Sequence, residues 1–495
     1  MPVELEYPSR QVAVIDIGSN SVRLVLYRLE GRAVWTMFNE KVLAGLGRDI
    51  AVTGRLYPEG VEMAMTALRR FAAVLEGVQP DTILTAATAA VREAQDGPDF
   101  CRQVAEQTGL NIRVLSGEEE ARYAALGVRA GAPASRGLVA DMGGASLELM
   151  KLGQSGPGIT LPLGPFALSG GKAFDADKLR SRVNRVLDTV ADDYRTSDLN
   201  AVGGAWRALA QMNMAMDGHP LKIVHQYCLS ASEARDLARM VTQQSRQVLE
   251  KQHGISKRRA ETLPYAALVL EGLIDRLGLQ RVHFSAWGVR EGLLHERIDP
   301  RLMAVDPLLA GCSAWGGRQG VDPSLPRALD GWLQTLTPAL PEVFGEERDA
   351  IITSSACRLA DIGARLHPDH RPELVFDQVL RSPIASQTHA ERAFMATTMY
   401  ARYGGTGKPP LQALVSQLLS PAGIKRAKAL GLAMRLACDL SGRSPQLLSN
   451  AALSVSKTHL RLTAVNGYAA MLLGSQTRRR AKALADVLEL ELVEF

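Results

Sequence analysis

The chain has 495 residues, of which 46% are hydrophobic and 5% aromatic, and its formal net charge is +5. This size and composition predict several globular domains with aliphatic cores, and the mild positive charge does not indicate nucleic acid. The five cysteines are scattered without a C-x-x-C pair, which excludes a disulfide framework and a zinc ribbon. Because acidic residues precede the first apolar stretch and no segment approaches about 18 apolar residues, we expect a cytoplasmic protein without membrane attachment.

The first 300 residues contain the same order of predicted elements twice. In residues 1–130, strands are predicted over 12–17, 22–29, 34–38, 82–87 and 112–115, with helices over 59–75, 100–108 and 118–128. In residues 131–300, strands are predicted over 137–141, 147–152, 159–163, 199–202 and 282–285, with helices over 176–194 and 288–296. The repeat predicts an α/β architecture of two related lobes with a cleft between them.

The remaining residues have a different pattern, after a stretch rich in Gly, Pro and Trp over 299–326. Residues 315–445 are predicted to form a helical domain, with helices over 346–365, 391–403 and 421–440. Residues 446–495 are predicted to form a small β-β-α-β unit with a helix over 477–487 and a strand over 489–495. Its hairpin is predicted to join strands 452–465 and 468–473 through Asn466-Gly467.

One short pattern occurs in both predicted lobes, each time where an apolar strand ends. It reads Asp16-Ile17-Gly18-Ser19-Asn20-Ser21 in the first lobe and Asp141-Met142-Gly143-Gly144-Ala145-Ser146 in the second. A strand that ends at an aspartate, a glycine turn and a serine hydroxyl can present backbone N–H groups to an anion. Two such turns facing each other predict a site that grips a phosphate chain from both sides.

Carboxylates beside a phosphate site require a cation, because they would otherwise repel the substrate. Asp16 and Asp141 stand at the ends of the two strands, and Glu148 lies seven residues beyond Asp141 on the returning strand. If that turn brings its strands together, Asp141 and Glu148 can share one Mg²⁺. The alternative for Glu148 is an exposed glutamate on a strand.

Two segments between the turns offer further candidates. Arg92 lies at a predicted strand-to-helix junction, where a guanidinium and a helix N-terminus suit an oxyanion, although an exposed surface arginine is the alternative. Glu119 lies in the first turn of a helix that begins after Ser116. It can either complete a capping box with Ser116 or face the cleft and orient a water molecule for hydrolysis.

Several other features have weaker interpretations. Gly203-Gly204 resembles a glycine turn that contacts adenosine in some kinases, but close packing between a strand and a helix also explains a glycine pair here. Basic runs at 257–259, 425–428 and 478–480 could line a channel for a polyanion, and each is more often an exposed helix face.

Five ordered motifs over residues 11–300 resemble the exopolyphosphatase and guanosine pentaphosphate phosphohydrolase family. Besides the two turns, the second of which continues to Glu148, they are the segments 88–94, 116–121 and 288–292. The resemblance implies two actin-like (ribonuclease H-like) lobes that hydrolyse their substrate in the cleft. It implies Glu119 as catalytic base, Asp141 and Glu148 as magnesium-linked carboxylates, and Arg92 with the turns 18–21 and 143–146 as phosphate-binding groups.

The chain departs from the family pattern in its second turn and in its helical domain. Ala145 replaces a third glycine and would be strained by roughly 1–2 kcal/mol if the position requires positive φ. The helical region resembles an HD-type domain, but Ala360-Asp361 stands where metal-dependent members have His-Asp. This difference predicts a scaffold and not a second active site.

The leading functional hypothesis is removal of terminal phosphate from inorganic polyphosphate by magnesium-assisted attack of water. Hydrolysis of guanosine pentaphosphate uses the same chemistry and is the nearest alternative, and both activities can coexist. The other hypotheses are an ATP-dependent kinase-like ATPase and a polyphosphate-binding protein without turnover. The resemblance also implies a homodimer.

Overall fold

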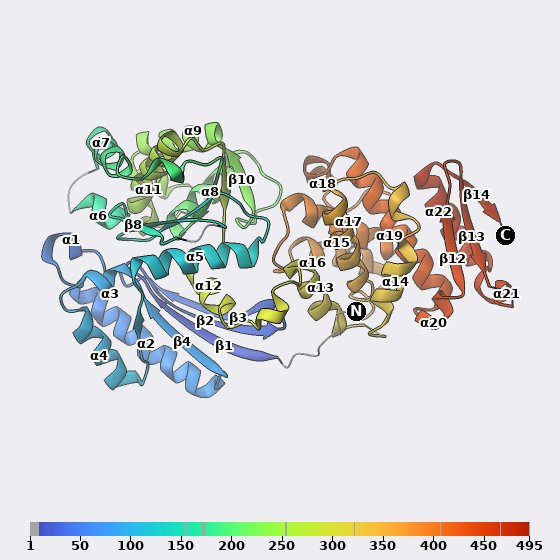
Figure 1. Ribbon diagram of the computed structural model, residues 1–495, viewed down its shortest axis with the longest axis horizontal. Coiled ribbons are helices and arrows are strands. Elements are labelled where there is room, and N and C mark those ends of the chain that lie inside the picture. The colour runs from blue at the N-terminus through green and yellow to red at the C-terminus, as the bar shows by residue number, and fades with distance from the viewer. Residues whose placement is uncertain are drawn as a thin grey trace. The chain divides into compact units, whose positions relative to one another are not determined.

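The computed structural model describes residues 9–153, 156–170, 174–252, 255–320, 322–405, 407–465 and 467–494. It divides the chain into two compact units, residues 1–302 and 303–495. Figure 1 shows the first unit in blue to yellow and the second in darker yellow to red. In the described residues, no helix has the length and apolar character needed to cross a membrane. The finer division into four domains stays a prediction.

The first lobe is a five-stranded mixed sheet in the order β3-β2-β1-β4-β5. Its strands are β1 (Arg10–Ile17), β2 (Val22–Glu30), β3 (Ala33–Val42), β4 (Thr82–Ala87) and β5 (Arg113–Val114). Its helices are α1 (Ile50–Thr53), α2 (Pro58–Val78), α3 (Ala89–Glu93) and α4 (Gly97–Thr108). Strand β1 pairs antiparallel with β2 and parallel with β4, so the end of β1 lies beside the turn that enters α3.

The second lobe repeats this arrangement in a six-stranded sheet ordered β10-β11-β9-β6-β7-β8. Its strands are β6 (Leu138–Met142), β7 (Leu147–Lys151), β8 (Ile159–Leu161), β9 (Asp198–Val202), β10 (Tyr227–Ser230) and β11 (Arg281–Phe284). The helices around it are α6 (Pro165–Ser169), α7 (Ala176–Leu187), α8 (Gly204–Met216), α9 (Ala231–Gln243), α10 (Arg246–Glu250) and α11 (Lys257–Leu277). Here β6 pairs antiparallel with β7 and parallel with β9, as β1 does with β2 and β4.

Two helices connect the lobes, α5 (Gly117–Gly131) and α12 (Val289–His295). Helix α5 follows the first lobe but packs on β6, β7 and β8 of the second, whereas α12 follows the second lobe and contacts β1 of the first (Figure 1). The two helices touch at glycines: a Cβ on Gly292 would lie 1.9 Å from the Tyr123 carbonyl oxygen. Tyr27 of β2 also donates a 2.7 Å hydrogen bond to Glu291. This exchange of helices joins both sheets into one unit.

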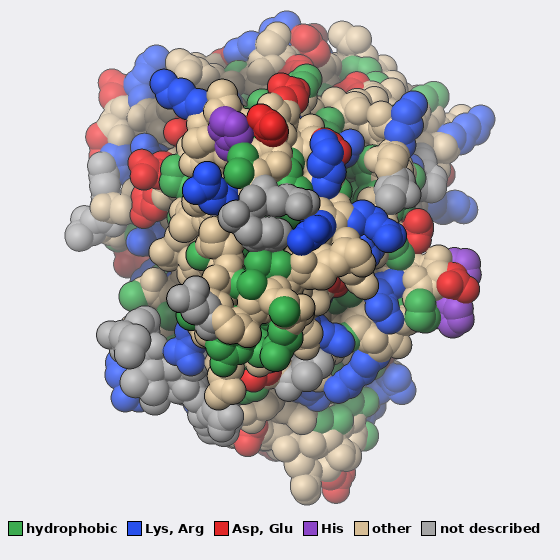
Figure 2. Space-filling view, turned by 90° about the vertical axis from the view of Figure 1, so that its right-hand side faces the viewer, with side chains coloured by type: hydrophobic (Ala, Val, Ile, Leu, Met, Phe, Trp, Pro, Cys, Tyr) green, Lys and Arg blue, Asp and Glu red, His purple; other side chains and the backbone are tan. Residues whose placement is uncertain are grey.

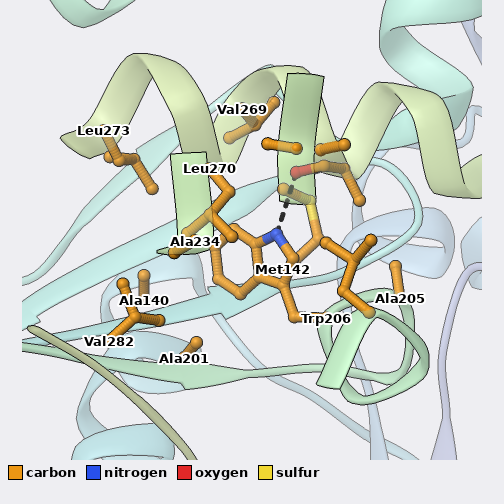
Figure 3. Close-up of a cluster of buried hydrophobic side chains, with 14 of the residues drawn as sticks. Ala140, Met142, Ala201, Ala205, Trp206, Ala234, Val269, Leu270, Leu273 and Val282 are labelled. Atoms are coloured by element: carbon orange, nitrogen blue, oxygen red, sulfur yellow. Dashed lines mark hydrogen bonds between the residues drawn. The ribbon is translucent and has the colours of Figure 1, made fainter. Parts of the chain in front are cut away.

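The core of the second lobe forms around Trp206 of α8, whose indole is fully buried. Figure 3 shows small and aliphatic side chains from β6, β9, β11 and the helices α9 and α11 against its ring. Its Nε1 donates a 2.9 Å hydrogen bond to the carbonyl of Ala266, which satisfies the one polar group of the buried side chain. This packing fixes α8 and therefore the Gly203-Gly204 turn from which α8 begins.

The second unit is helical up to residue 448 and ends in a three-stranded sheet. Its helices are α13 (Pro307–Gly317), α14 (Leu325–Leu333), α15 (Glu346–Arg358), α16 (Arg371–Leu380), α17 (His389–Arg402), α18 (Gln412–Leu418), α19 (Pro421–Ser441) and α20 (Pro445–Leu448). Strands β12 (Ala451–Val455) and β13 (His459–Ala464) precede α21 (Ala469–Leu472), α22 (Ser475–Leu488) and β14 (Glu491–Glu494). The sheet order is β12-β13-β14, so the predicted β-β-α-β order holds with one extra helical turn.

The predicted C-terminal hairpin was wrong in its position. Strands β12 and β13 pair around residues 456–458, and residues 469–472 are helical. The turn is closed because the Ser456 hydroxyl accepts hydrogen bonds from the backbone N–H groups of Thr458 and His459. This polar turn interrupts the predicted long strand. Of the predicted Asn466-Gly467 turn, Asn466 lies outside the described residues.

A larger side chain at Gly292 should destabilise the first unit. We expect Gly292→Ala to lower the free energy of unfolding by about 1–3 kcal/mol or more, because the added methyl group meets backbone that cannot move independently. The matched control is Gly77→Ala in α2, where a Cβ meets nothing within 4 Å and helix propensity favours alanine. Thermal unfolding monitored by circular dichroism tests both, and equal unfolding temperatures would contradict the role of the α5–α12 contact.

Candidate active site

The two glycine turns face each other across a pocket in the first unit. In each turn the first glycine N–H donates a 3.0 Å hydrogen bond to the carbonyl of the serine that ends the pattern, from Gly18 to Ser21 and from Gly143 to Ser146. The turns are in direct contact, since a Cβ on Gly144 would lie 2.9 Å from the Cβ of Ser19. The duplicated sequence pattern is therefore a duplicated structure.

Neighbouring backbone braces both turns. Gly47 N–H donates a 2.8 Å hydrogen bond to the Ser19 carbonyl, and Gly164 N–H donates a 3.1 Å bond to the Ala145 carbonyl. Ala145 is not among the described residues with positive φ. The strain considered for an alanine at this position is therefore absent, and the turn keeps its geometry without a third glycine.

The pocket has a cavity of about 160 Å³. Most predicted phosphate-binding residues line it, namely Gly18, Ser19, Asn20, Ser21, Gly143, Gly144 and Ser146. Asp16 and Asp141 also line it, as do Gly203 and Gly204. Four predicted site residues are not among the residues that form its walls, namely Arg92, Glu119, Ala145 and Glu148.

The expectation that Glu119 faces the cleft was wrong, and the adjacent Glu120 lines the pocket instead. Glu119 completes a capping box: its Oε2 accepts a 2.9 Å hydrogen bond from Ser116 N–H, and its Oε1 pairs with Arg113 on the exposed side of α5. Consecutive helical residues point about 100° apart, so only one of the two glutamates can face the cleft. Glu120 is 5% exposed, and the capping alternative applies to Glu119.

Arg92 holds this buried glutamate in place. Its Nη1 donates hydrogen bonds to Glu120 Oε2 at 3.1 Å and to the Leu115 carbonyl at 2.8 Å. Burial raises the pKa of Glu120, and the positive charge of Arg92 opposes that rise. In this structure Arg92 therefore positions a carboxylate, whereas the sequence had suggested contact with phosphate.

Asp141 and Glu148 are directly opposite each other in the β6–β7 ladder, as the turn predicted. Glu148 is 1% exposed, and neither of its carboxylate oxygens has a hydrogen-bond partner. Burial, and then the negative charge of Glu120, raises the pKa of Glu148. Burial likewise raises the pKa of Asp141 to about 6, with a contribution from Asp16. The site thus brings several buried carboxylates together.

Basic side chains line the pocket near these carboxylates, namely Arg23, Lys41, Arg207, Arg259 and Arg290. Arg290 Nη1 donates a 2.7 Å hydrogen bond to Asp16. Burial lowers the pKa of Lys41 to about 8, assisted by the charges of Arg259 and Arg23. Burial, and then the charge of Arg290, lowers the pKa of Arg207 to about 10. An anion in the pocket would reduce this mutual repulsion.

Sequence reasoning missed most of these cations. Arg290 lies inside the motif at 288–292, but the sequence pattern indicates no role for it. Arg23 is opposite Asp16 in the β1–β2 ladder, which is the position that Glu148 has opposite Asp141 in the β6–β7 ladder. The comparison of the two turns could have identified Arg23. Of the basic run at 257–259, Arg259 does line the pocket. In the run at 425–428, Arg426 is buried and paired with Asp349 at 3.4 Å.

The donor chemistry fits a divalent cation, although the described residues include no preformed group of three or more His, Cys, Asp or Glu ligands. Asp16 and Asp141 line the pocket, and Glu148, opposite Asp141 in the β6–β7 ladder, has carboxylate oxygens without a hydrogen-bond partner. Hard cations prefer oxygen ligands, and Mg²⁺ commonly takes only one or two carboxylates with water and substrate phosphates. A complete protein cage is therefore not required.

Two mixed lobes with exchanged helices, facing glycine turns and a pocket of carboxylates and arginines define a phosphohydrolase of actin-like fold. The chain belongs to the Ppx/GppA phosphatase family, which it matches over residues 24–300, and residues 333–492 match the exopolyphosphatase C-terminal family. The predicted family, fold class and enzyme class, a phosphoanhydride hydrolase, are confirmed.

Two relatives show the similarity at modest identity. The chain is 28% identical over 308 residues to Exopolyphosphatase 1 of Mycobacterium tuberculosis, covering 58% of this chain and 88% of that protein. It is 25% identical over 446 residues to Retrograde regulation protein 2 of Saccharomyces cerevisiae, covering 81% of this chain and 74% of that protein.

Solved structures agree in fold. A Cytophaga hutchinsonii exopolyphosphatase superposes with a TM-score of 0.55 at 21% identity, over 59% of this chain and 98% of that one. The Aquifex aeolicus family member gives a TM-score of 0.51 at 24% identity, over 59% and 98%.

In the described part of the helical region, no three His, Cys, Asp or Glu side chains are placed together to hold a metal ion. Asp361 is buried and lies 3.5 Å from Arg443 and 4.0 Å from Arg402. His367 and His370 lie on an exposed turn, whereas His389 is buried in α17. These positions agree with the scaffold interpretation, while the HD-type likeness itself stays a prediction.

The raised pKa of Asp141 should make stability depend on pH. Because its folded pKa of about 6 exceeds the ordinary 3.8, the folded chain binds more protons, and its contribution to the free energy of unfolding falls as pH rises through about 4–6. We expect Asp141→Asn, relative to the unsubstituted chain, to gain about 1–2 kcal/mol between pH 5 and pH 8 in EDTA. Urea denaturation measures this. The exposed control Asp188→Asn should show no such gain, and a gain equal to that of the control would refute the assignment.

Proposed function

We propose that the chain is an exopolyphosphatase that releases orthophosphate from the end of inorganic polyphosphate. The observation that supports this most strongly is the contact between the two glycine turns at Ser19 and Gly144, beside a pocket that contains both carboxylates and cations. Backbone N–H groups of the turns can bind phosphate oxygens, and Arg23, Lys41 and Arg207 can neutralise the following phosphates.

In this proposal Glu120 is the general base. Its buried carboxylate is held by Arg92 and has a raised pKa, which makes it a better proton acceptor near neutral pH than an exposed glutamate. A water molecule lies between Glu120 and the terminal phosphorus and transfers a proton to the Glu120 carboxylate. At the same time the water oxygen attacks the phosphorus in line with the bond to the bridging oxygen. The bond to the bridging oxygen then breaks, and the N–H groups of the turns stabilise charge on the equatorial oxygens.

Asp141, Glu148 and Asp16 are proposed to hold Mg²⁺, which would supply charge neutralisation on the phosphate oxygens. The unpartnered oxygens of Glu148 and the raised pKa of Asp141 support this assignment. The chain's own contribution is to keep these carboxylates together on adjacent strands. Binding of a cation would favour their ionised forms.

The surroundings of Gly203-Gly204 favour polyphosphate over a nucleotide. A nucleoside placed there would meet Arg259, whose Nη2 would lie 2.7 Å from a Cβ on Gly204, with Lys41 and Arg207 also lining the pocket. A wall of basic side chains suits further phosphate groups of a polyphosphate chain better than it suits a nucleobase. Guanosine pentaphosphate stays the second candidate substrate, and kcat/KM for both substrates would rank them.

The base assignment can be tested by exchanging neighbouring glutamates. We expect Glu120→Gln to lower kcat on long polyphosphate by about 10²- to 10⁴-fold with little change in binding, because it removes only the proton acceptor. Glu119→Gln is the matched control and should keep near-native kcat, with a stability loss of at most about 1 kcal/mol from the capping box. Phosphate release by malachite green measures kcat. Near-native turnover by Glu120→Gln would exclude Glu120 as the base.

The cation assignment predicts a pH-dependent stabilisation by magnesium. Mg²⁺ at about 100 times its Kd should stabilise the folded chain by about 2.7 kcal/mol. The increase in unfolding temperature should be larger at pH 8 than at pH 5, because protons compete for Asp141 and Glu148 at low pH. Glu148→Gln should lose most of the increase, whereas Glu119→Gln should retain it. An increase unaffected by Glu148→Gln would place the cation elsewhere.

The resemblance further supports a homodimer in the cytoplasm as part of this proposal. Light scattering of the purified chain tests the dimer. Tight polyphosphate binding without phosphate release in Mg²⁺ would instead identify a binding protein without turnover, and phosphate transfer from ATP to an acceptor would identify a kinase.

A further inference from the structure

The second unit contains an arginine-rich pocket that the proposed hydrolysis does not use. Its cavity of about 250 Å³ is far larger than the roughly 10–15 Å³ that one water molecule needs. Arginines from four helical regions line it, namely Arg371, Arg402, Arg435, Arg443 and Arg480. Figure 2 shows one face of the molecule, on which Lys and Arg side chains lie among acidic and hydrophobic ones.

Arg402 at the end of α17 is the most deeply placed of these cations. It is 6% exposed, and its Nε has no hydrogen-bond partner. Its nearest carboxylate, on Asp361, is 4.0 Å away and also lies 3.5 Å from Arg443. One carboxylate therefore lies near two guanidinium groups, and the buried Nε of Arg402 lacks a hydrogen-bond acceptor.

The opposite side of the pocket repeats this imbalance. Asp439 of α19 accepts a 2.8 Å hydrogen bond from Arg480 Nε and lies 3.8 Å from Arg435 Nε. Burial, and then the charge of Arg480, lowers the pKa of Arg435. The remaining cation, Arg371, donates to the backbone carbonyls of Ala364 and Leu366. Four guanidinium groups thus share two carboxylates, Asp361 and Asp439.

Backbone geometry keeps the pocket open for these side chains. Gly404 has φ of +89°, and a Cβ there would lie 2.5 Å from Arg435 Nη1, so the guanidinium lies against bare backbone. The Tyr403 hydroxyl donates a 2.7 Å hydrogen bond to the Ala360 carbonyl and receives one from Gly363 N–H. The Tyr403 hydroxyl is thus fully hydrogen-bonded, and the carboxylates of Asp361 and Asp439 are ion-paired. The pocket is therefore suited to binding and not to acid–base catalysis.

We propose that this pocket is a second anion site, which binds a pyrophosphate-type group through Arg402, Arg435, Arg443 and Arg480. Planar guanidinium groups pair bidentately with phosphate oxygens, and a group with several negative charges compensates more than one of them at once. Among the described residues that line it, each basic side chain is an arginine, which fits recognition by fixed geometry. The group can come from inorganic pyrophosphate or from a nucleoside diphosphate.

Isothermal titration calorimetry of the full chain with methylenebisphosphonate, a hydrolysis-resistant pyrophosphate analogue, in EDTA tests the site. We expect the Arg443→Gln/Arg480→Gln variant to lose one binding event, or to weaken it at least tenfold, while kcat on polyphosphate stays within about twofold. Arg479→Gln lies on the same helix outside the pocket and should bind as the unsubstituted chain does. Circular dichroism melting confirms that each variant is folded.

A cleft variant, Lys41→Ala/Arg207→Ala, separates the two sites. It should retain the binding event that Arg443→Gln/Arg480→Gln removes, even if the proposed hydrolysis in the cleft proves incorrect. Competition by pyrophosphate and by guanosine diphosphate then identifies which source of the group binds more tightly. Unchanged binding in a folded Arg443→Gln/Arg480→Gln variant, or loss of all binding in the cleft variant alone, would overturn the proposal. Equal weakening by Arg479→Gln would also overturn it.

Discussion

The contact between the two glycine turns is the constraint on which the rest of the first unit depends. Gly144 can approach Ser19 only because it has no side chain, and the backbone at Gly47 and Gly164 holds each turn from behind. The two sheets can bring their turns together because α5 and α12 exchange lobes and pack through glycines. The close approach of the α5 and α12 backbones therefore allows the two turns to approach each other closely at the pocket.

The same closeness makes the pocket electrostatically costly. Burial raises the pKa values of three carboxylates in the site, those of Glu120, Asp141 and Glu148. Burial also lowers the pKa values of two basic side chains that line the pocket, Lys41 and Arg207. Each group is therefore ready to accept a ligand of opposite charge. Buried charged groups with shifted pKa values are typical of functional sites, since a core selected for stability alone would bury aliphatic side chains instead.

The second unit uses charge in two different ways. Arg426 is buried but paired with Asp349 and the Pro341 carbonyl, so its charge is compensated within the fold. In the arginine-rich pocket, by contrast, Arg402 and Arg443 share the single carboxylate of Asp361, at 4.0 and 3.5 Å. A run of basic letters does not distinguish these cases, because the difference lies in which acidic side chain the fold places nearby.

The sequence by itself determined the repeated order of strands and helices, the two turns and the pairing of Asp141 with Glu148, because these follow from local periodicity and from short connections between neighbouring strands. It misplaced the C-terminal hairpin, where a Ser-based turn outcompeted the Asn-Gly signal. Only the tertiary structure decided that Glu120 faces the pocket while Glu119 caps its helix, and that Arg92 holds a carboxylate. Those roles depend on the rotation of α5 against two sheets and on burial, which arise from contacts between residues far apart in the chain.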